Sequence, residues 1–165
     1  MSVSETVRLR RELLLEQAVA KRENDLVRLG TRAVLTLPGM RQNRLEESQL
    51  RNLAAVARDT TSVEVIANFI RYQIARAPNN WGTGANEFGH TIIQHLYGPI
   101  REQAAAAAQE VGHALEQVDA DLHGDAYIAL IRQYIGYLNR AFYFYNKTKD
   151  KDAAATQLGQ VLDDK

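Results

Sequence analysis

The stretch GDAYIALIRQYIGYLNRAFYFYNKTK, residues 124–149, decides the fold of this chain because it is apolar on almost every side. Its apolar and aromatic residues are too many for the one-third face of an ordinary surface helix. The remaining residues recur at steps of three and four and so share one narrow stripe, formed by Arg132, Gly136, Asn139, Arg140, Tyr143 and Lys147. We therefore expect a central helix that other helices wrap, with the basic stripe left open.

The composition predicts a helical protein. Of the 165 residues, 45% are hydrophobic and only three are proline, and the abundant Ala, Leu, Glu, Gln and Arg lose little rotamer freedom in a helix. The length suits one hydrophobic core. We expect an all-α, single-domain compact bundle of five to six helices over residues 1–149. A polar, mobile C-terminal tail, with room for a short helix at 153–162, should follow over residues 150–165.

Several classes of function lack a sequence signal. The chain has no cysteine, so disulfides and thiolate metal sites are excluded. It has no Gly-x-Ser-x-Gly, Walker or dinucleotide motif. We therefore expect no catalytic activity and no cofactor. The first residues carry charges every few positions, and no run of about 18 apolar residues occurs. A soluble, cytoplasmic protein without membrane contact is the expectation.

Further helices are predicted from periodicity and from stop and start signals. The first should cover residues 4–29 and stop at Gly30. A capping box between Asn43 and Glu46 should start a second at about residue 44, ending near 58. The third should cover 63–76, and Trp81 should anchor the loop 77–86 to the core, with a contact to a partner or a base as the alternative. A break at Gly98-Pro99 should separate helices at 87–97 and 100–121.

The charge is unevenly distributed along a neutral chain. Residues 1–58 hold 11 Lys plus Arg against 7 Asp plus Glu, a balance of +4, and residues 59–165 hold 9 against 13, a balance of −4. The basic part could contact a polyanion and the acidic part a neighbouring molecule. An ordinary mixed surface is the alternative.

Arg44, Arg51 and Arg58 are spaced by seven residues, which keeps them in one row if the second helix begins early enough. Guanidinium groups about 10 Å apart along a helix suit repeated phosphates. The alternative is a solvated face with local pairs to Glu47. Arg132, Arg140 and Lys147 add cations on the central helix, and Tyr143 could stack on a base unless it belongs to the core.

Residues 87–90 and 110–113 both read Glu-x-x-His, the spacing at which di-iron bundles place a carboxylate and an imidazole on one helical face. If the chain folds back at Gly98-Pro99, the two motifs lie about 10 Å out of register, at about 1.5 Å per residue. Inward positions on the other helices are mostly apolar. A di-metal carboxylate helical-bundle enzyme is therefore the weaker alternative, and we assign no metal ligand.

Two short patches resemble the small subunit of type III CRISPR effector complexes, of the Csm type. Residues 46–53 read EESQLRNL, similar to the Ser/Thr-Gln-Leu-Arg run that opens a helix in that family. The aromatic helix ending in Tyr145-Asn146-Lys147 before a charged tail is the second likeness. The Trp81 loop, the Gly98-Pro99 step and the alanine-rich segment depart from the family pattern. The Cmr-type small subunit or a related variant is the other member of this lineage to consider.

The resemblance implies a small, all-helical, non-catalytic subunit. Several stacked copies would line the inner side of the effector, contacting guide RNA and target RNA through basic residues, next to other subunits. Carried over by position, Arg51 is the best match, with Arg58 and Arg44 on the same face and Arg140 and Lys147 from the last helix. A helical scaffold or interaction protein without a nucleic-acid role is the further alternative.

Overall fold

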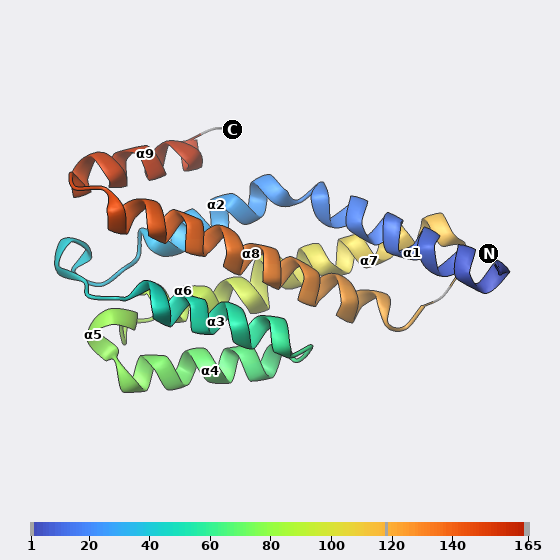
Figure 1. Cartoon of the computed structure of the whole chain (residues 1–165), viewed down its shortest axis with the longest axis horizontal. Helices are drawn as coiled ribbons and strands as arrows, with labels where there is room; N and C mark the ends of the chain where they lie inside the picture. The colour runs from blue at the N-terminus through green and yellow to red at the C-terminus, as the bar shows by residue number, and fades with distance from the viewer. Residues whose placement is uncertain (1, 118, 164–165) are drawn as a thin grey trace.

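The central element is α8 (Leu122–Lys147), around which the other helices are arranged (Figure 1). The structure is a computed structural model that describes residues 2–117 and 119–163. The side chains of α8 that form the core are Leu122, Ala126, Tyr127, Ile128, Leu130, Ile131, Tyr134, Ile135, Leu138, Phe142 and Tyr145. The helix packs most extensively against α2, and then against α7 and α3. The predicted central helix is therefore confirmed.

In the described residues every regular element is helical, which confirms the all-α class. The elements are α1 (Val3–Ala20), α2 (Glu23–Val34), α3 (Glu47–Asp59), α4 (Val63–Arg76), α5 (Pro78–Trp81), α6 (Phe88–His95), α7 (Arg101–Leu115), α8 and α9 (Lys151–Asp163), with a 3₁₀ turn η1 (Met40–Gln42) and a π-helical turn η2 (Leu96–Ile100). The expected five to six helices are too few. The first predicted helix is two helices, and α9 adds another. Within the described part of the chain, no helix has the length and apolar character needed to cross a membrane.

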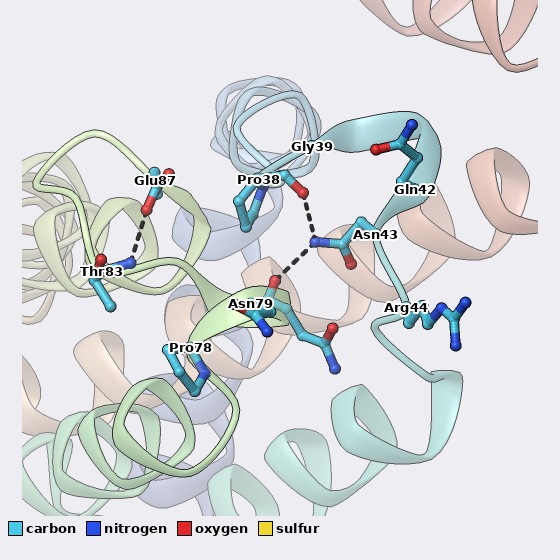
Figure 2. A pocket seen from close by; sticks show the side chains of 10 residues that line it. Pro38, Gly39, Gln42, Asn43, Arg44, Pro78, Asn79, Thr83 and Glu87 are labelled. Atoms are coloured by element: carbon cyan, nitrogen blue, oxygen red, sulfur yellow. Dashed lines mark hydrogen bonds between the residues drawn. The ribbon is translucent and has the colours of Figure 1, made fainter.

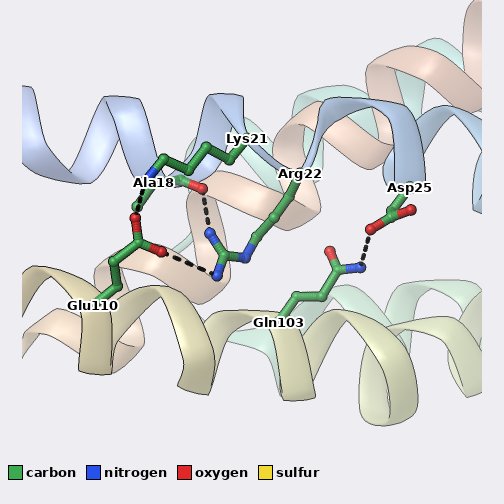
Figure 3. Close-up of polar contacts among 6 residues, drawn as sticks. All are labelled: Ala18, Lys21, Arg22, Asp25, Gln103 and Glu110. Carbon is green, nitrogen blue, oxygen red and sulfur yellow. Dashed lines mark hydrogen bonds and ion pairs between the residues drawn. The ribbon is translucent and has the colours of Figure 1, made fainter.

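The first predicted helix is divided where Lys21 and Arg22 meet α7 (Figure 3). Both side chains pair with Glu110, and Arg22 also donates to the carbonyl oxygen of Ala18, with Nη1 and O 2.5 Å apart. These contacts satisfy a carbonyl at the end of α1 and attach the junction to α7. The chain then begins α2 at Glu23.

The predicted stop at Gly30 is wrong, because α2 continues through this residue to Val34. A β-carbon at Gly30 would lie 2.9 Å from the backbone nitrogen of Leu138. The glycine therefore serves close packing of α2 on the backbone of α8 rather than helix termination.

The predicted break at Gly98-Pro99 is also wrong, because α6, η2 and α7 are continuous from Phe88 to Leu115. Proline lacks an N–H and would leave a carbonyl unpaired in a regular helix. A π-helical turn accommodates it. The hydroxyl of Tyr127, on α8, donates to the carbonyl oxygen of Leu96 at 2.6 Å and so satisfies an acceptor in this turn.

The start of α3 is three residues later than predicted. The capping box consists of Glu46 and Gln49, which exchange hydrogen bonds between side chain and backbone. Asn43 instead donates from Nδ2 to the carbonyl oxygens of Pro38 and Asn80, at 2.9 and 3.0 Å, and so joins the segment before η1 to α5. The predicted loop 77–86 contains the short helix α5, at whose end Trp81 is fully buried beside Phe88, which confirms Trp81 as an anchor.

The last described segment forms α9, which packs on α2 and α8. Ala154 and Leu158 are buried, and Arg41 donates to Asp152 with Nε and Oδ1 3.0 Å apart. Lys151 donates to the carbonyl oxygens of Tyr145 and Asn146 at 2.7 and 2.8 Å. Residue 1 and the final residues 164–165 of the predicted tail lie outside the described residues.

Candidate nucleic-acid interface

The helices α3 and α8 run antiparallel beside each other (Figure 1). Two residues of the polar stripe of α8, Arg132 and Asn139, bond the backbone of α3 along this seam. Arg132 donates to three carbonyl oxygens at the C-terminal end of α3, those of Ala57 at 2.9 Å, Arg58 at 3.1 Å and Thr60 at 3.1 Å. Asn139 donates to the carbonyl oxygen of Leu50 at 3.3 Å. The expectation of a fully open stripe is therefore wrong, since part of it attaches α3.

At the opposite end of the seam, one carboxylate joins cations from both helices. Glu47 lies 4.0 Å from Nη1 of Arg51 and 3.3 Å from Nζ of Lys147, and it accepts a hydrogen bond from Asn146 at 3.0 Å. The Asn146 hydrogen bond, followed by the Lys147 contact, lowers the pKa of Glu47. Arg51 of α3 and Lys147 of α8 thus lie on one face, and the two oxygens of the Glu47 carboxylate face one cation each.

Tyr143 gives this face an exposed aromatic ring. The residue is 55% exposed, and Nζ of Lys147 lies 5.6 Å from its ring centroid. A hollow of about 150 Å³ separates it from Arg51 and is lined by Glu47, Leu50, Asn139 and Phe142 as well. Tyr143 is therefore not a core residue, and the alternative that placed it in the core is wrong. Its ring is available for stacking on a base.

The arginine row contains two members rather than three. Arg51 and Arg58 lie on α3 with side chains 71% and 73% exposed, about 10 Å apart along the axis. Arg44 precedes the helix, in the segment between η1 and α3, at the rim of a polar pocket of about 530 Å³ (Figure 2). The late start of α3 removes Arg44 from the row.

Arg140 lies on the exposed edge of α8, seven residues before Lys147. Its guanidinium carbon is 5.7 Å from the ring centroid of Tyr137. The structure thus brings Arg51, Arg58, Arg132, Arg140 and Lys147 to the α3–α8 seam and its rim. We call these five residues, with Tyr143, the seam surface.

The acidic part of the chain pairs with the basic part inside the fold. Arg11 bonds Asp119 and Asp125 at 2.6 and 2.7 Å, and Glu110 pairs with the α1–α2 junction. The Arg11 hydrogen bond lowers the pKa of Asp119, and the Lys21 hydrogen bond lowers that of Glu110. The sequence asymmetry is therefore largely cancelled by internal pairs.

The two Glu-x-x-His motifs lie far apart on one continuous helical rod, so the expected fold-back between them is wrong. Glu87 and Glu110 are separated by 23 residues, about 35 Å at about 1.5 Å per residue. Glu87 accepts hydrogen bonds from the backbone N–H groups of Thr83 and Gly84, each at 2.7 Å. Within residues 2–117 and 119–163, no group of three or more His, Asp or Glu side chains could hold a metal ion.

A buried histidine was not singled out by the sequence. His95 is 8% exposed, and its Nδ1 lies 2.9 Å from the hydroxyl of Tyr134. Burial, followed by the charge of Arg32, lowers the pKa of His95 to about 4. Burial also raises the pKa of Tyr134. The spacing of Phe88, Ile92 and His95 on α6 was the available signal, since it places them on one helical face.

Comparison of the chain with models of protein families, with curated proteins and with solved structures finds no match.

Proposed function

We propose that this protein is a non-catalytic, RNA-binding small subunit of a multi-subunit type III CRISPR effector in the cytoplasm. The seam surface would contact the phosphates of guide RNA and target RNA, and copies of the chain would stack beside other subunits. The observation that carries the proposal is that one exposed cation from α3, Arg51, and one from α8, Lys147, lie beside one exposed tyrosine, Tyr143. Guanidinium groups bond phosphate oxygens in pairs, and an aromatic ring accepts any base.

The neutral net charge fits a subunit that acts in an assembly. A single copy offers few phosphate contacts and should bind RNA weakly. Several copies linked along one strand raise the effective concentration of each contact, so that modest individual affinities combine into stable binding. A small number of cations per copy is therefore sufficient.

The test is the salt dependence of binding to a labelled single-stranded RNA, measured by fluorescence anisotropy. Four contacts, from Arg51, Arg58, Arg140 and Lys147, predict that log K falls with log salt with a slope of about −3, at about 0.7 per contact. The double variant Arg51→Glu, Arg58→Glu should weaken binding and reduce the slope by about 1.4. A parent slope near zero would contradict the proposal.

The matched control reverses two arginines outside the seam surface. Arg8 lies on α1 and Arg76 ends α4, and both are exposed. The double variant Arg8→Glu, Arg76→Glu changes the net charge by the same amount. It should retain the parent slope, whereas an equal loss in both double variants would indicate a diffuse charge effect and not a seam contact.

A variant that should increase RNA affinity tests the same face of the protein. The variant Glu47→Gln removes the negative charge that pairs with Arg51 and Lys147 while keeping a side chain of similar size. RNA affinity should rise, because phosphate no longer competes with an internal anion. Unchanged affinity would mean that RNA does not reach this end of the seam.

Isolation of the protein with its native partners separates the assembly proposal from the scaffold alternative. An RNA-binding subunit should co-purify with guide RNA, and the RNA should be lost from complexes that carry Arg51→Glu, Arg58→Glu. A complex that contains the protein and no RNA would favour the scaffold.

A further inference from the structure

A hollow of about 390 Å³ lies on the exposed face of α8, and it is lined by one helix alone. Its lining residues are Arg132, Gln133, Gly136, Tyr137 and Arg140. Gly136 lies at the centre, four residues from each arginine, or about 6 Å along the axis. The missing side chain of Gly136 creates the notch between them.

Neither packing nor backbone geometry requires glycine at position 136. A β-carbon placed there would meet no heavy atom within 4 Å, in contrast to Gly30, where it would meet the backbone of α8. Glycine within a helix costs about 1 kcal/mol relative to alanine. The residue therefore weakens the central helix without serving a close contact, as Gly124 also does, and what distinguishes Gly136 is the pair of arginines on either side of it.

The two guanidinium groups that border the notch are held in place by other contacts. Arg132 uses Nε and Nη2 to bond the end of α3, so Nη1 remains for a ligand. Arg140 lies over the ring of Tyr137, and helical side chains lean toward the N-terminus, which brings Arg140 over Gly136. None of the described residues that line the hollow is acidic. Its chemistry is that of an anion site.

We propose that the notch over Gly136 is a seat for one phosphate group, bonded by Arg140 and bordered by Arg132. A guanidinium group presents paired donors to phosphate oxygens, and Arg132 needs little reordering because its hydrogen bonds to α3 already fix it. This inference rests on the proposed function in one respect, since it takes the phosphate from the backbone of the bound RNA. It adds a specific subsite, with a steric requirement, to the seam surface.

The decisive variant fills the notch and keeps every charge. Gly136→Leu should lower the affinity for single-stranded RNA and reduce the salt slope by about 0.7, the value for one lost phosphate contact. Arg140→Gln should produce a similar loss, and the double variant should lose little more, because both changes remove the same contact. Gly136→Leu with the parent affinity and slope would overturn the seat.

Three controls keep the outcomes distinct. Circular dichroism verifies that Gly136→Leu is folded, and if it is not, Arg140→Gln and its double variant with the smaller Gly136→Ala carry the test. A parent that binds no RNA would refute the proposed function, whereas loss of RNA binding in Arg51→Glu, Arg58→Glu but not in Gly136→Leu would refute the seat alone. Inorganic phosphate distinguishes the source: if Gly136→Leu weakens phosphate binding and leaves RNA binding intact, the RNA assignment is wrong.

Discussion

The His95–Tyr134 pair predicts a loss of stability in mild acid. His95 has a pKa of about 4 in the folded protein, against 6.5 for an ordinary histidine. Between these values the unfolded chain binds one proton more than the folded chain, so the free energy of unfolding rises with pH. The stability that neutral His95 contributes is complete above about pH 6.5. It decreases as the pH falls from 6.5 to about 4, and it is lost below about pH 4.

The size of this loss in the free energy of unfolding follows from the difference between the folded and the ordinary pKa of His95. Each pH unit below 6.5 costs about 1.36 kcal/mol. At about pH 5 the folded protein should therefore have lost about 2 kcal/mol relative to about pH 7.5. For a chain of this length the loss corresponds to a decrease in Tm of about 4–8 °C.

The assay is urea unfolding followed by circular dichroism from about pH 7.5 to about pH 5, with His95→Asn as the control. Asn can place a polar atom near the Nδ1 position toward Tyr134 and does not titrate. The carboxylates of Glu47, Glu110 and Asp119 have lowered pKa values and stay ionised in this range. His95→Asn should be less stable than the parent at about pH 7.5 but should show a slope smaller by about 2 kcal/mol over the range. Parallel pH profiles for parent and variant would refute the reasoning.

Three further predictions concern packing and helix ends. Gly136→Ala should raise the free energy of unfolding by about 0.5–1 kcal/mol. Gly30→Ala should lower it, because a β-carbon at position 30 would lie 2.9 Å from a backbone nitrogen of α8. Thermal unfolding of the two variants measures both effects. Tyr127→Phe removes the donor to the Leu96 carbonyl in the π-helical turn and should cost about 1–2 kcal/mol in urea unfolding. Arg132→Met removes the donor to two carbonyls of α3 and to that of its C-cap residue Thr60, and should speed amide hydrogen exchange in the last turn of α3.

The fold class and the central helix could be predicted because they depend on local periodicity. The helix α4 has the predicted bounds of 63–76. Gly30 and Pro99 were misread because each was treated as a local stop signal. Gly30 is explained by the approach of α8, and Pro99 is accommodated by a π-helical turn that Tyr127 of α8 contacts through the Leu96 carbonyl. In both cases the contacting residues of α8 lie in a distant part of the chain, and periodicity carries no information about them.

The seam surface likewise contains residues whose exposure the sequence predicts and residues whose contacts depend on distant parts of the chain. The exposure of Arg51 and Arg58 follows from their position opposite the apolar residues of α3, and the sequence indicates it. The partners of Arg132 lie 72–75 residues away, so its attachment to α3 could not be predicted. Arg44 left the row because the capping box uses Glu46 and Gln49, a shift of three residues that decides whether a side chain belongs to the helix.

The two roles of the α8 stripe determine which substitutions can report on RNA binding. Arg132 is bonded to the backbone of α3, so a variant at this position would lose packing and phosphate contact together, and reduced RNA binding would have two explanations. Arg58 pairs only with its neighbour Asp59 among the described residues, and Arg140 contacts only a ring of its own helix. Their replacement leaves the α3–α8 contacts intact. Loss of binding at these two positions, with unchanged stability, is therefore the evidence that separates a nucleic-acid surface from a helical seam that happens to be basic.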